Sequence, residues 1–142
     1  MTSRFRKLAF SLLATAAPLA PGGASADGAI SVELNKVEQA GDDCRVYLVM
    51  NNALATTLSA IKLDLVLFDT DDIIAHRFAL NVAPLAAGKT SVKSFDVPDM
   101  SCETIGRVLL NDAIDCRGDS GPIEECTGEV AVSSRGEVEF FR

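Results

Sequence analysis

Three carboxylates and the single histidine of this chain lie close together in the sequence. Asp69, Asp71 and Asp72 fall within four residues, and His76 follows them. Calcium prefers carboxylate oxygens as ligands, and a carboxylate beside an imidazole can act as an acid–base pair. The EF-hand pattern is not met, because Ile73 stands where an oxygen-bearing residue is required. We therefore expect a solvated hairpin turn followed by a strand, with calcium binding or hydrolysis as the alternative function.

A second group of carboxylates lies in the stretch 111–128, which is rich in Asp, Gly and Glu and predicts a long loop. Loops held at one end of a rigid scaffold often carry binding contacts. The candidate partner-binding residues are therefore Asp115, Asp119, Glu124 and Glu125. The nearby Gly-Asp-Ser-Gly sequence at 118–121 does not match the nucleophile elbow of a hydrolase. We expect no catalytic residue, no cofactor and no metal ligand.

The four cysteines are Cys44, Cys102, Cys116 and Cys126. An even number of cysteines in a small exported chain predicts two disulfides. A zinc site would need pairs separated by two to four residues, and a redox site would need a C-x-x-C motif. The cysteine count alone leaves three pairings open.

The first 26 residues have the pattern of a cleaved signal peptide. Arg4, Arg6 and Lys7 precede an apolar run at 8–20, and Ala24-Ser25-Ala26 forms a cleavage site. The apolar run is shorter than the ~20 residues that span a membrane. The two arginines are not adjacent, which favours general secretion over twin-arginine export. We expect an exported protein with no membrane span after cleavage.

Residues 27–142 form one expected domain of 116 residues. Loss of the three basic residues of the signal peptide changes the net charge from −7 to −10. This acidity argues against nucleic-acid binding, since phosphate backbones attract basic surfaces. It serves solubility in the first place, and it is also compatible with a basic or cationic partner.

Alternation of apolar and polar residues predicts short strands along the whole domain. The clearest is 59–68, where every second residue from Ile61 to Leu67 is apolar. Such strands, with turn residues between them and no helical period, predict an all-β, immunoglobulin-like antiparallel β-sandwich of about seven strands. A short helix at 101–106 is the local alternative. The expected strands are 30–34, 44–50, 59–68, 73–82, 89–97, 102–110, and one or two within 129–141.

This arrangement favours one disulfide pairing. In such a sandwich the second and sixth strands lie in different sheets and begin at the same end. Cys44 and Cys102 begin those strands, whereas Cys116 and Cys126 both fall in the expected loop. The other pairings would span roughly 17–20 Å along a strand, beyond the reach of a disulfide. We therefore expect Cys44–Cys102 and Cys116–Cys126.

Three stretches resemble the FxLYD-type immunoglobulin-like domains of exported bacterial proteins. They are Val46–Asn52, Ile61–Asp69 and Ala87–Ser91, with Phe68-Asp69 where the family has Tyr-Asp. The mature chain is also similar to small exported alphaproteobacterial proteins that carry a Tat-signal label. The resemblance implies a periplasmic β-sandwich and brings no catalytic residues. Taken together, these observations predict a non-enzymatic, disulfide-stabilised module that binds an unidentified protein or envelope partner.

Overall fold

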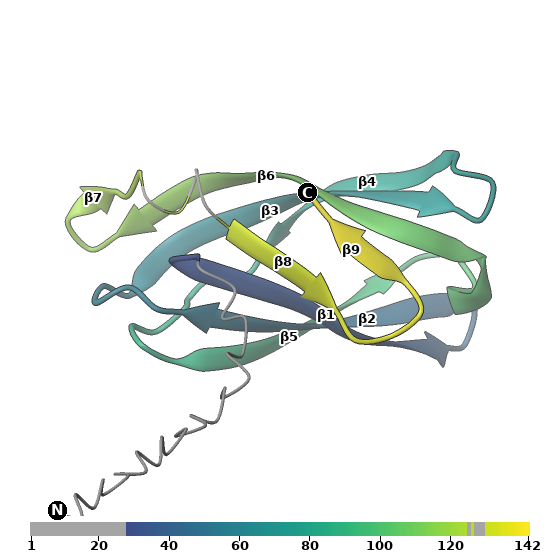
Figure 1. The fold of residues 1–142 in the computed structure, drawn as a ribbon, viewed down its shortest axis with the longest axis horizontal. Coiled ribbons are helices and arrows are strands. Elements are labelled where there is room, and N and C mark those ends of the chain that lie inside the picture. Colours follow the sequence, from purple (N-terminus) through teal and green to yellow (C-terminus); the bar gives the residue numbers. More distant parts are fainter. Residues whose placement is uncertain (1–27, 125, 127–129) are drawn as a thin grey trace, which may run out of the picture.

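The computed structural model describes residues 28–124, 126 and 130–142. Two β-sheets pack face to face (Figure 1). Sheet A has the strand order β5-β2-β1-β8, and sheet B the order β4-β3-β6-β7, with β9 also pairing with β6. The strands are β1 (Ile30–Ala40), β2 (Asp43–Asn52), β3 (Leu58–Asp69), β4 (Ile74–Asn81), β5 (Thr90–Val97), β6 (Ile105–Gly118), β7 (Gly121–Pro122), β8 (Val130–Ser134) and β9 (Glu139–Phe141).

The core lies between the two sheets and confirms the alternation seen in the sequence. Ile61, Leu63, Leu65 and Leu67 of β3 are all 0% exposed. They face the buried side chains of β1 and β2, such as Leu48. Since successive side chains of a strand point to opposite faces, this apolar row faces the other sheet. β3 itself lies between β4 and β6 in sheet B.

The all-β prediction is confirmed, but the prediction of purely antiparallel sheets is wrong. β8 pairs in parallel with β1, and β9 pairs in parallel with β6. β6 ends at the end of the sandwich where β1 begins, so that β8 runs in the same direction as β1 (Figure 1). The chain then reverses between β8 and β9, and β9 therefore follows the direction of β6. Nine strands lie in the described part of the chain, against about seven expected.

The predicted loop 111–128 is wrong in its first half. β6 continues to Gly118 and pairs with β3 over most of its length. The pairing contains several register shifts, and Asp115 has a positive φ of 57°. Bulges of this kind interrupt the regular alternation, which is why the stretch resembles a loop in the sequence. The helical alternative is present only as a 3₁₀ turn at Cys102–Thr104.

Two disulfides join the elements in the expected pairing. Cys44 at the start of β2 is bonded to Cys102, and their Cα atoms are 4.9 Å apart. Cys116 is bonded to Cys126, with a Cα separation of 6.3 Å. Cys116 lies within β6 and not in a loop, which corrects its predicted position. One bridge therefore lies just before β6 and the other near its end.

No described residue belongs to a helix that is long and apolar enough to cross a membrane. The expected signal peptide, residues 1–26, and the candidate residue Glu125 lie outside the described residues.

Candidate functional site

The acidic turn between β3 and β4 is closed by one of its own carboxylates. Oδ1 of Asp69 accepts hydrogen bonds from the backbone N–H groups of Asp71 and Ile73, both at 2.9 Å. The N–H of Asp72 donates to the Asp69 carbonyl oxygen at 3.1 Å, and Asp72 has a φ of 62°. A short acidic side chain that bonds to nearby backbone N–H groups is typical of a tight turn. Asp69 therefore stabilises the turn, and this agrees with the interpretation of the stretch as a hairpin turn.

The third carboxylate of this turn is paired with an arginine that the sequence did not single out. Arg107 of β6 lies 2.8 Å from Asp72, measured from Nε to Oδ1, in an ion pair whose geometry is not that of a hydrogen bond. Its guanidinium lies over the rings of Phe68 and Phe141, at 5.2 and 5.0 Å from their centroids. These contacts combine charge pairing with cation–π attraction. They join the turn, β6 and β9 on the outer face of sheet B.

The only sequence signal for this cluster is Gly106. A Cβ atom at this position would lie 2.4 Å from the carbonyl oxygen of Asp69. A glycine is therefore needed where β6 approaches the end of β3. Nothing in the sequence shows which side chain this close approach brings to Asp72.

His76 lies on β4 opposite Leu67 of β3, and its side chain is half-buried. The neighbouring Arg77 points to the other face and binds Asp64 of β3 through two hydrogen bonds of 3.1 and 2.8 Å. Among the described residues, no group of three or more His, Cys, Asp or Glu side chains is placed to hold a metal ion. The turn carboxylates and His76 are therefore close in sequence but do not form a joint ligand set.

Polar side chains of β3 also form hydrogen bonds and ion pairs on the outer face of sheet B. The carboxylate of Asp64 accepts a further hydrogen bond of 2.7 Å from Nδ2 of Asn111. The hydrogen bonds from Arg77 lower the pKa of Asp64, and the bond from Asn111 adds to this effect. Lys62 lies 3.5 Å from Asp115, between Nζ and Oδ2. These contacts link β3 to both of its neighbours.

The hairpin of β6 and β7, which the Cys116–Cys126 bridge holds, is called the stapled hairpin here. The candidate partner-binding residues in and beside it occupy different environments. Asp115 is half-buried and binds both Arg117 and Lys62, and the hydrogen bond from Arg117 is the main reason that its pKa is lowered. Asp119 is exposed in the turn between β6 and β7. Glu124 lines a hollow of about 250 Å³ beside the Cys116–Cys126 bridge. Asp119 and Glu124 are therefore exposed, whereas Asp115 is half-buried and is linked to β3 through Lys62.

The comparisons with known proteins add no relatives. No protein-family model, no curated protein and no solved structure matches this chain.

Proposed function

We propose that this chain is a small exported, non-enzymatic module of the periplasm that binds a protein or envelope partner through the ends of its sandwich. The observation that carries the proposal is the pair of disulfides at the two ends of β6. Each bridge fixes a turn region to the frame, and a rigid frame lowers the entropy cost of binding through its loops. Disulfides are also typical of proteins that fold outside the cytosol.

The finer fold assignment belongs to this proposal. The arrangement of β1, β2 and β5 in one sheet, with β3, β4 and β6 in the other, supports an immunoglobulin-like sandwich related to the FxLYD-type domains. Such sandwiches present loops at both ends, which suits a binding module. The parallel strands β8 and β9 are this chain's departure from that scheme.

The non-enzymatic assignment is supported by the structural contacts that the candidate carboxylates form. Asp69 closes its turn, Asp72 pairs with Arg107, and Asp115 pairs with Arg117. The negative charge of the domain favours a cationic partner and disfavours nucleic acid.

Site-specific photo-crosslinking in cells that export the chain tests the proposal. A photoreactive phenylalanine replaces Asp119 at one end of the sandwich, Glu137 at the other end, or Val92 on the outer face of sheet A, where it is 63% exposed. We expect an adduct of constant mass from at least one end and none from the control position 92. The absence of an adduct from both ends would overturn the proposed function.

A further inference from the structure

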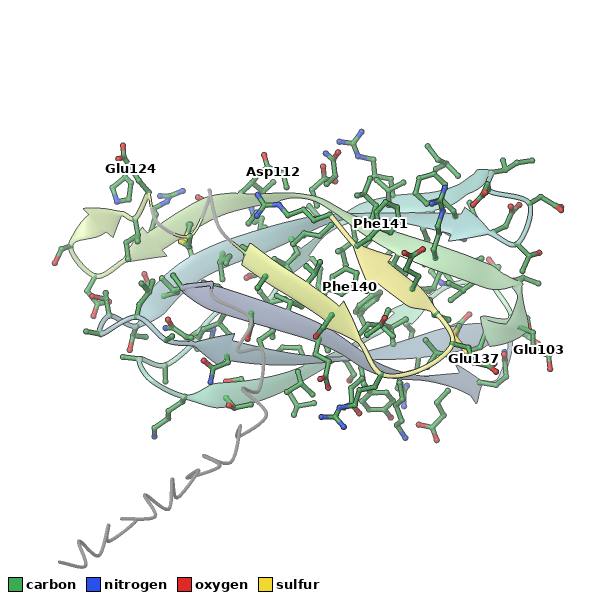
Figure 2. All side chains as sticks on the ribbon, viewed as in Figure 1. Glu103, Asp112, Glu124, Glu137, Phe140 and Phe141 are labelled. Carbon is green, nitrogen blue, oxygen red and sulfur yellow. A yellow bond between two sulfur atoms is a disulfide. The ribbon has the colours of Figure 1, made fainter. Side chains whose placement is uncertain are left out.

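A hollow of about 270 Å³ opens at the end of the molecule opposite the stapled hairpin. It lies between β1, the 3₁₀ turn at Cys102–Thr104 and the turn that joins β8 to β9. Its apolar lining comes from Leu34, Val37, Ile105 and Val138. Figure 2 shows Glu103 and Glu137 at this end of the molecule and Glu124 at the other. The hollow is large enough for one or two side chains and smaller than most ligand pockets.

The edge of β1 is unpaired beside this hollow in the described part of the chain. β8 pairs with β1 only as far as Leu34, where the N–H of Arg135 donates to the Leu34 carbonyl oxygen at 3.0 Å. β1 itself continues to Ala40, and a register shift against β2 follows at Asn35. The pairing of β1 with β2 continues past this shift as far as Ala40 and Asp43, whereas β8 ends at Ser134. Residues 35–38 therefore offer backbone donors and acceptors to an added strand.

The charges that remain available at the hollow are negative. Glu103 and Glu137 are exposed, and neither forms an ion pair with another described residue. Lys36, the one basic residue of the lining, is engaged by Glu38 at 3.2 Å and lies 4.6 Å from the centre of the Tyr47 ring. An incoming group therefore meets an apolar floor and two carboxylates that have no ion-pair partner among the described residues.

We propose that this hollow docks an extended basic segment of a partner protein. The segment adds a strand to β1 at residues 35–38, in line with β8, and inserts an apolar side chain into the hollow. Lysine or arginine side chains on either side of it pair with Glu103 and Glu137. This mode of recognition takes affinity from main-chain hydrogen bonds and specificity from the pocket and the charges. The inference rests on the proposed function and names the site and the chemistry of its partner.

Two variants separate this site from general electrostatic attraction. The double variant Glu103→Gln/Glu137→Gln removes both charges, and Asp42→Asn/Asp112→Asn removes two exposed charges that do not line the hollow. Two exposed ion pairs together contribute about 1 kcal/mol, which is about five-fold in the dissociation constant, so we expect the first variant to bind about five-fold more weakly and the second to be unchanged. Gly136→Val should block the hollow and still fold, because a Cβ at this position meets no atom within 4 Å.

The experiment uses residues 27–142 with both disulfides formed and isotopically labelled amides. An eight-residue peptide that alternates lysine with valine is titrated against it, with a glutamate–valine peptide as the control. We expect the amide signals of Val37, Glu103 and Gly136 to shift with the lysine peptide only, and the shifts to disappear in Gly136→Val. Equal responses to both peptides, or no response at the hollow, would overturn the docking site.

The outcomes also distinguish this inference from the proposed function. An adduct from position 119 in cells, without a peptide response at the hollow, removes the docking site and leaves the binding function in place. Shifts that grow with protein concentration in the absence of peptide would identify a second copy as the occupant, and would overturn the proposal of a basic segment.

Discussion

Asn52 provides the sharpest test of how this sandwich is held together. It is 1% exposed and is the only buried polar residue of the described chain. Its Nδ2 donates to the carbonyl oxygens of Thr56 and Leu85, and its Oδ1 accepts from the N–H of Leu54, each at 3.0 Å. One side chain therefore joins the link between β2 and β3 to the segment between β4 and β5.

We expect Asn52→Ala to lower the free energy of unfolding by about 3 kcal/mol. Three hydrogen bonds are lost, each contributing about 1 kcal/mol. The Leu85 carbonyl still accepts from the N–H of Leu58 at 2.9 Å, so it does not lose its last partner. The N–H of Leu54 and the carbonyl oxygen of Thr56 lose their hydrogen bonds to the amide of Asn52. Because both bonds are partly buried, water replaces them incompletely. The loss corresponds to a melting temperature lower by roughly 12 °C.

Asn52→Asp adds a dependence on pH. An ionised carboxylate has the shape of the amide but cannot donate, so it would face the two carbonyl oxygens of Thr56 and Leu85. Burial and this repulsion raise the pKa of the new carboxyl above its unfolded value of about 3.9. A raised folded pKa means that stability is greatest below the unfolded pKa and is lost as the pH rises through the folded pKa. The variant should therefore be less stable than Asn52→Ala near neutral pH and should regain stability relative to it in acid.

Urea unfolding of residues 27–142, followed by far-UV circular dichroism at about pH 7 and about pH 4, measures both effects. The matched control is Asn51→Asp, an exposed neighbour whose side-chain amide donates to the Thr90 hydroxyl at 3.1 Å. A loss below about 1 kcal/mol for Asn52→Ala would refute the reasoning. An equal pH dependence for the two aspartate variants would refute the argument from burial.

Three further predictions concern the braces of the frame. Asp69→Ala should cost about 1–2 kcal/mol, because two backbone N–H groups lose their acceptor, and calcium should not change the melting temperature of the wild type; a calcium shift of several degrees would restore the alternative function. Removal of the Cys44–Cys102 bridge, which closes a loop of 58 residues, should lower the free energy of unfolding in urea by about 4 kcal/mol. Removal of the Cys116–Cys126 bridge, which closes 10 residues, should lower it by roughly 3 kcal/mol. The reverse order would contradict the loop-entropy explanation. Asp64→Asn should weaken the dependence of the free energy of unfolding on pH in acid. The pKa of Asp64 is lowered in the folded state, so its carboxylate contributes stability above the unfolded value near 3.8, and this stability is lost as the pH falls through the folded pKa. An unchanged dependence on pH would show that the pairing of Asp64 with Arg77 and Asn111 adds no stability.

Much of the frame was predictable because alternation is a local signal. The buried row of β3 follows directly from side chains that point to opposite faces at every second residue. The disulfide pairing followed once the strands were placed in two sheets. The second half of β6 was missed because its bulges, with Asp115 in a left-handed conformation, interrupt the same alternation.

The candidate surfaces were predictable only in part. The sequence alone indicated that Asp119 and Glu124 lie near a disulfide, and it assigned a turn to the carboxylates that begin at Asp69. It gave no sign that Arg107 pairs with Asp72, or that Glu103 and Glu137 border one hollow, because these partners come from separate strands and turns. The direction of β8 and β9 likewise depends on how the chain returns across the two sheets. By itself, then, the sequence determined which residues form the core and the disulfides, since periodicity and cysteine position are properties of short segments. Only the tertiary structure decided where strand pairing stops and which charges are left without partners, because both depend on contacts between distant parts of the chain.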